Sequence, residues 1–132
     1  MNVATIRTGL ADTIGSIAGL RVYGTVPDAP SVPCAVIYPD SIQYGRTLDG
    51  TGNVRMVIQV LAAAINSQAG QDALDGYCAD SGATSIFATI ESDPTLGGAC
   101  QNAQVTEMRS YGVTGDSTRY YSAELVVDIL AT

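Results

Sequence analysis

Histidine, lysine and tryptophan are all absent from the 132 residues of this chain. Without histidine, a serine or cysteine nucleophile lacks its usual general base, and a mixed cysteine–histidine zinc site cannot form. Lysine cannot replace that base, because the chain has none. These absences predict that the protein is not an enzyme, and we expect no catalytic residue, no metal and no cofactor.

Basic charge is also scarce, since six arginines stand against 13 acidic residues and the formal net charge is −7. Affinity for phosphates comes mainly from clustered lysine and arginine, so this balance argues against general nucleic-acid binding. It argues equally against an anionic membrane surface as a partner. The acidic pairs Asp72/Asp75 and Glu124/Asp128 have the spacing of solvated faces on a helix and on a strand.

Long apolar runs are missing too, because none approaches the ~20 residues of a membrane-spanning helix. The N-terminus lacks the basic-then-apolar layout of a signal peptide, so we expect assembly in a cytoplasm. Cys34, Cys78 and Cys100 are far apart and odd in number. We predict that they are small buried side chains, with a reactive thiol or an inter-subunit disulfide as the alternatives.

The most informative stretch that the sequence does contain is residues 53–64, which is rich in valine and isoleucine and free of glycine and proline. This composition predicts the central strand of a sheet. One face is apolar throughout, whereas the other is polar at Arg55 and apolar later. Because the dense turn signal of residues 48–52 precedes it, we predict a long hairpin whose tip stands clear of the core.

Hydrophobic periodicity predicts the other elements. Apolar residues at steps of three and four favour a helix over residues 3–18, which Gly19 would end. A second helix is expected to begin at Asn66 or Ser67 and a third at Thr84 or Ser85. In the second helix, the residues expected to face inward are Ala69, Ala73, Leu74 and Tyr77. The remaining strands are expected at residues 20–23, 34–38, 41–47, 103–113 and 121–129.

This order of elements predicts one α+β domain over residues 1–132. Its core would be a mainly antiparallel sheet of four to five strands. The N-terminal helix and the central helix pair would pack on one face of that sheet, and the long hairpin would project from it.

Charged and tyrosine side chains mark a candidate contact surface. Arg46 and Arg55 flank the predicted hairpin tip with Asp49 between them, either as solvated charges or as a contact with a neighbouring subunit. Seven tyrosines against one phenylalanine also suit an interface. Tyr120 and Tyr121 would lie on opposite faces of the last strand. The candidate interface residues are Arg46, Asp49, Asn53, Arg55 and Tyr120.

The order and spacing of these segments resemble the tail terminator proteins of long-tailed, siphovirus-type bacteriophages. The resemblance covers nearly the whole chain, although no short motif defines that family. It depends on the N-terminal helix, Val22-Tyr23, the segment of residues 34–39, the hairpin return strand of residues 55–63, the helix pair of residues 68–91 and the closing strand of residues 121–129.

The resemblance implies a structural virion protein at the head-proximal end of the tail. It would cap the tail tube, stop its polymerisation and form the head–tail joining surface as a hexameric ring. The partners would be further copies of the chain, the tail tube protein and the head–tail connector or neck proteins, while DNA passes through the ring without specific binding. A neck or head-completion subunit and a non-viral α+β ligand-binding or regulatory module remain alternatives.

Overall fold

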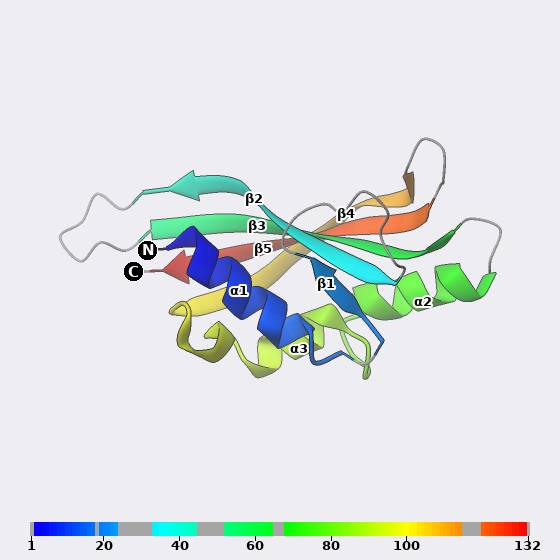
Figure 1. The fold of residues 1–132 in the computed structure, drawn as a ribbon, viewed down its shortest axis with the longest axis horizontal. Helices are drawn as coiled ribbons and strands as arrows, with labels where there is room; N and C mark the ends of the chain where they lie inside the picture. The colour runs from blue at the N-terminus through cyan, green and yellow to red at the C-terminus, as the bar shows by residue number, and fades with distance from the viewer. Residues whose placement is uncertain are drawn as a thin grey trace.

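The computed structural model describes residues 2–17, 19–23, 33–44, 52–64, 68–114 and 120–131. Its elements are α1 (Val3–Ile14), β1 (Arg21–Tyr23), β2 (Cys34–Gln43), β3 (Gly52–Ala64), α2 (Gln68–Cys78), α3 (Ile86–Ser92), the 3-10 turn η1 (Leu96–Gly98), β4 (Asn102–Thr114) and β5 (Tyr120–Ala131). The strands form one elongated sheet, and the helices lie along one side of it (Figure 1).

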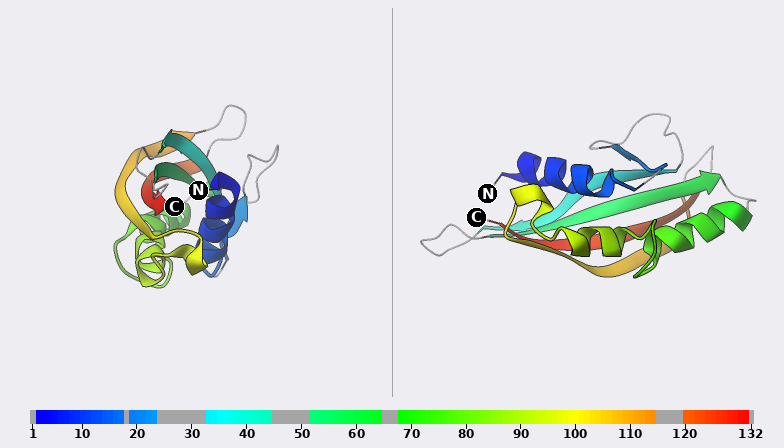
Figure 2. Two further views of the ribbon diagram at one scale, coloured as in Figure 1. Left: turned by 90° about the vertical axis from the view of Figure 1, so that its left-hand side faces the viewer. Right: turned by 90° about the horizontal axis from the view of Figure 1, so that it is seen from below.

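The five strands lie in the order β1-β2-β3-β5-β4, so the valine-rich β3 is the central strand, as its composition predicts. Only the short β1 runs parallel to its neighbour, and every other pair is antiparallel. The predicted α+β class and the mainly antiparallel sheet are therefore confirmed. Figure 2 shows α1 beside the α2–α3 pair, on the same side of the strands.

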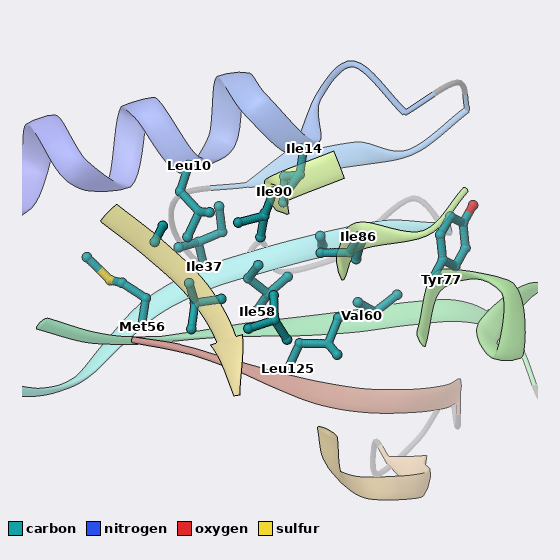
Figure 3. Packing of buried hydrophobic residues seen from close by; sticks show 14 of the residues in the cluster. Leu10, Ile14, Ile37, Met56, Ile58, Val60, Tyr77, Ile86, Ile90 and Leu125 are labelled. Carbon is teal, nitrogen blue, oxygen red and sulfur yellow. The ribbon is translucent and has the colours of Figure 1, made fainter. Parts of the chain in front are cut away.

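The two faces of the sheet differ in what covers them. On the helix-covered face, Met56, Ile58 and Val60 of β3 belong to one buried cluster with side chains from all three helices (Figure 3). The helical members are Ile6, Leu10 and Ile14 of α1, Leu74 and Tyr77 of α2, and Ile86 and Ile90 of α3. Burying each large aliphatic side chain contributes about 1.5–3 kcal/mol. This face therefore holds the core.

The opposite side of the sheet, on which no described helix packs, is called the uncovered face below. Five apolar residues are buried without belonging to the helix-side cluster: Cys34, Val36, Val57, Leu61 and Val126. Strand register places all of them on the uncovered face. As the sequence predicts, this side of β3 is polar at Arg55 and becomes apolar toward Leu61.

Helix α1 is shorter than expected, because it ends at Ile14 and not at Gly19. Gly15 is the C-cap, and its N–H donates to the carbonyl of Ala11 at 2.8 Å. Glycine has low helix propensity, and the next two bonds, from the N–H of Ser16 to the carbonyl of Thr13 and from Ile17 to Ile14, have three-residue spacing. Ile17 still reaches the core from this turn.

Strand β2 is longer than expected and does not end before Pro39. It continues to Gln43 through a bulge between Pro39 and Ser41. A bulge on a strand that has an open side accommodates a residue without an N–H, which explains why proline does not break this strand. The expected strands over residues 34–38 and 41–47 are thus one strand as far as Gln43.

The helix pair agrees with the sequence in one helix and departs from it in the other. Ser85 caps α3 as predicted, and its hydroxyl accepts from the N–H of Ala88 at 3.0 Å. In α2, Leu74 and Tyr77 are buried, but Ala73 is exposed. The inward stripe runs through Gly70, Leu74 and Tyr77 at steps of four and three, which leaves Ala73 on the outer side. The candidate caps Asn66 and Ser67 and the side chain of Ala69 lie outside the described residues.

The predicted hairpin is described only along its paired arms. β2 and β3 pair antiparallel from Cys34 opposite Leu61 to Gln43 opposite Asn53. Residues 45–51 lie outside the described part of the chain, so the projecting tip stays a prediction. In the residues that the structure covers, no helix is long and apolar enough to cross a membrane.

Candidate interaction face

The uncovered face is built from rungs, each made of the residues that stand opposite one another on β2, β3, β5 and β4. Strand register gives them in order as Cys34/Leu61/Ser122/Gly112, Val36/Gln59/Glu124/Arg109, Tyr38/Val57/Val126/Glu107, Ser41/Arg55/Asp128/Gln104 and Gln43/Asn53/Leu130/Asn102. Polar side chains dominate the last two rungs, whereas apolar and polar residues mix in the first three. The face therefore changes character along the strands.

A three-residue network lies in the middle of this face. The phenol of Tyr38 donates to one carboxylate oxygen of Glu124 at 3.3 Å, and Nε of Arg109 donates to the other at 3.1 Å. β3 lies between β2 and β5, so the Tyr38–Glu124 bond passes over the central strand. Burial raises the pKa of the Tyr38 phenol, and the adjacent carboxylate raises it further. The phenol thus remains a neutral donor at neutral pH.

A second ion pair lies two rungs beyond the Arg109–Glu124 pair. Nε of Arg55 is 3.2 Å from Oδ1 of Asp128, and both side chains are nearly half exposed. A pair this exposed contributes only about 0–1 kcal/mol to stability. It borders a hollow of about 300 Å³ whose lining includes Ser41, Gln43 and Asn53. The polar end of the face therefore offers hydrogen-bonding groups to a partner more than it stabilises the fold.

The structure brings together only part of the predicted interface. Asn53 and Arg55 both line this polar hollow. Tyr120 is half-buried at the other end of the sheet, opposite Ala64, roughly 36 Å from Asn53 at about 3.3 Å per residue along β3. Tyr121 packs against the core. Arg46 and Asp49 lie outside the described residues.

Sequence reasoning missed the Tyr38–Glu124–Arg109 network. It predicted that Glu124 and Asp128 are solvated, yet each accepts from an arginine. The alternating pattern of β5 did indicate one feature correctly, namely that both carboxylates lie on the face away from the core. Their partners follow from the insertion of β5 between β3 and β4, and no local pattern reveals that strand order.

Among the described residues, the remaining polar and charged side chains lie apart from one another or serve local turns. A hollow of about 650 Å³ between α1 and η1 is bordered by Asp12 and Asp93. Asp93 already accepts from the N–H of Gly97 at 3.0 Å and from the Thr95 hydroxyl at 3.3 Å, so it caps the local turn. In the described ranges, no three acidic, cysteine or histidine residues gather as metal ligands.

The three cysteines are free thiols. Cys34 is fully buried as predicted, whereas Cys78 and Cys100 are half-buried at the margin of the core. Burial, with a smaller contribution from Asp75, raises the pKa of Cys78 to about 11. Since the thiolate is the reactive species, such a thiol is a weak nucleophile at neutral pH.

Comparison with known proteins does not assign this chain to a family. No family model matches the sequence, and no curated protein matches it either.

Proposed function

We propose that this chain is a structural subunit of a bacteriophage tail, a tail terminator that acts as a ring of identical copies on the head-proximal end of the tail tube. The observation that supports this proposal is the asymmetry of the sheet. Three helices cover one face, while the other presents two ion pairs and a polar hollow. A surface of alternating charge, arranged on a rigid sheet, fixes the orientation of a protein partner.

The mechanism would be geometric. Each copy offers two different surfaces to its neighbours, and such a heterologous contact closes into a ring only when its rotation divides the circle. A closed ring seated on the tube covers the surface that would accept the next tube ring. Growth then stops, and the outer side of the ring receives the connector or neck proteins of the head.

The net charge suits a ring through which DNA passes. With 13 acidic and six basic residues, the chain has no excess of positive charge with which to grip phosphates. In this proposal the protein makes and breaks no bonds, and its location is the virion.

The test is deletion of the gene in a phage that carries it, followed by electron microscopy of the tails. We expect tubes of uncontrolled length without heads, and restoration of normal virions when the wild-type chain is supplied. The variant Arg55→Asp should restore them poorly, whereas the exposed α2 variant Asp72→Ser should serve as a competent control. Tails of normal length joined to heads would refute the proposal, and normal-length tails without heads would favour the neck assignment.

A further inference from the structure

Two segments of strand in the described chain have a neighbour on one side only. β1 pairs with β2 only over Cys34 to Val36, so residues 38–43 of β2 have no described strand on their outer side. β4 is the last strand of the sheet, and its outer side is likewise open among the described residues. Such edges present N–H and C=O groups that can pair with another strand.

The other half of each edge is either covered or irregular. β1 covers the beginning of β2. Near the end of β4, Ser110 has a φ of +56° in a bulge, and the next residue, Tyr111, donates from its hydroxyl to Asp75 of α2 at 2.5 Å. The segment of β4 considered for pairing is therefore residues 102–107, which precede this bulge.

The two open segments lie at the same level along the sheet. Three rungs connect them, because Tyr38 shares a rung with Glu107, Ser41 with Gln104, and Gln43 with Asn102. Every step from β2 through β3 and β5 to β4 is antiparallel, so β2 and β4 run in opposite directions. A rotation about an axis along the strands therefore places the β4 segment of one copy beside the β2 segment of the next, in antiparallel sense.

The registers of the two segments also match. β2 has an extra residue between Pro39 and Ser41, and β4 has one between Val105 and Glu107. Both irregularities fall between the same two rungs, so the two strands use equal numbers of residues there. A direct pairing of these segments needs no further bulge, and Pro39 removes at most one N–H donor from it.

The helix-covered side of this junction has a place for an apolar side chain. A groove of about 330 Å³ runs between α3 and β4, lined in part by Phe87, Ile90, Pro94 and Ala103. In the matched register, Ile42 of the second copy stands opposite Ala103 and on the same face as this groove. The exposed Tyr44 follows two residues later, and it is the most exposed large hydrophobic side chain among the described residues.

We propose that a second copy of this chain occupies the β4 edge, with its residues 38–43 paired antiparallel to residues 102–107 and its Ile42 at the α3–β4 groove. On the uncovered face, this pairing sets Ser41 opposite Gln104, Gln43 opposite Asn102, and the Tyr38 phenol opposite the Glu107 carboxylate. Ser41 and Gln43 can each exchange a side-chain hydrogen bond with the amide opposite, the Tyr38 phenol keeps its bond to Glu124 of its own copy, and no like charges stand opposite each other. The contact is heterologous, so copies add in one direction. This pairing deepens the proposed function and rests on one part of it, the association of identical copies.

A cysteine pair tests this register in the full-length chain. In the double variant Ser41→Cys/Gln104→Cys, the two thiols of one copy are about 14 Å apart, across three strand spacings of about 4.8 Å, and cannot bond to each other. Between paired copies they face each other directly. Mild oxidation at high protein concentration should therefore give a ladder of disulfide-linked oligomers on non-reducing gels.

The controls are the wild type, which has the three native thiols, each single variant, and the out-of-register pair Ser41→Cys/Glu107→Cys. A ladder confined to the matched pair supports the proposal. A chain that stays monomeric at its highest soluble concentration, or oligomers that cross-link no better than the controls, would overturn it. If the chain caps tail tubes but the matched pair does not cross-link, the register is rejected and the proposed function stands. If the pair cross-links but deletion of the gene leaves the tails normal, the register stands and the proposed function is rejected.

Charges introduced at Ser41 and Gln104 provide a second measurement that does not depend on thiols. Ser41→Glu/Gln104→Glu should weaken self-association roughly two- to five-fold, and Ser41→Glu/Gln104→Lys should restore it. Sedimentation at several concentrations gives both values. Equal association of the two variants would count against the pairing.

Discussion

The hydroxyl of Tyr38 lies 3.3 Å from a carboxylate oxygen of Glu124, although the central strand β3 separates the two strands that carry them. Arg109 holds the second oxygen of the same carboxylate. Glu124 of β5 thus accepts from side chains of both β2 and β4 on the uncovered face.

Replacing this shared acceptor should destabilise the fold more than replacing the neighbouring exposed one. We expect Glu124→Ala to lower the free energy of unfolding by about 1–3 kcal/mol, because two donors in a part-buried setting lose their partner. Asp128→Ala, which breaks the more exposed pair with Arg55, should cost under about 1 kcal/mol. Urea denaturation measures both, and equal losses would show that the network contributes no more than a surface ion pair.

Stability should fall in alkaline solution, in part because of Cys78. Its pKa is raised from the ordinary value of 9.0 to about 11 in the folded chain. Between these two values the unfolded chain releases this proton more readily than the folded one, so the free energy of unfolding decreases as pH rises from about 9 to about 11. Cys78→Ala should show a shallower decrease over that window.

The tyrosines provide the control for this pH dependence. Burial also raises the pKa of Tyr77 above its ordinary value of 10.0. Burial raises the pKa of the Cys34 and Cys100 thiols above the ordinary 9.0 as well. Cys78→Ala should therefore keep a shallower slope from about pH 9, to which the tyrosines add from about pH 10. A decrease identical to that of the wild type would contradict the assignment to the thiol.

The centre of the helix-covered face should be sensitive to loss of volume. Ile58 is fully buried in the middle of β3 beneath the helices, and Figure 3 shows it among the labelled core residues. Ile58→Ala should lower the free energy of unfolding by about 2–5 kcal/mol, as removal of a buried aliphatic side chain does. Leu130→Ala is the matched control, because Leu130 is exposed, and a loss of similar size there would contradict this location of the core.

Close approach of α1 to η1 should make Gly9 hard to replace. A Cβ at Gly9 would meet Cβ of Ala99 at 2.7 Å and the carbonyl oxygen of Leu96 at 2.9 Å. We expect Gly9→Ala to destabilise the chain by about 1–3 kcal/mol despite the better helix propensity of alanine. Gly112→Ala, where no atom lies within 4 Å of the added Cβ, should be close to neutral. Thermal unfolding compares the two, and a stabilising Gly9→Ala would show that α1 can move away.

How far the sequence predicts this structure depends on how local each signal is. The valine-rich β3, the alternation of β5 and the Ser85 cap are properties of neighbouring residues, and the structure confirms them. The end of α1 and the passage of β2 through Pro39 were wrong in the prediction. In the first case three-residue hydrogen bonds replace helix after Ile14, and in the second an open strand side tolerates proline.

The site was predictable only in part for the same reason. Asn53 and Arg55 are close in sequence and share one face of a strand, so their proximity follows from the strand itself. Tyr38, Glu124 and Arg109 come from three strands, and their meeting depends on the order β2-β3-β5-β4. Long-range strand order has no local signature, which is why the network emerges only from the folded chain.

The bond between Tyr111 and Asp75 has a consequence for how sequence changes will show themselves. Like the pairing of β1 with β2, it is a contact at one end of the sheet that forms within a single copy of the chain. Substitutions at this end should lower the melting temperature at every protein concentration. Substitutions at the opposite end should leave the melting temperature of the monomer unchanged and show their effect only at concentrations where copies associate.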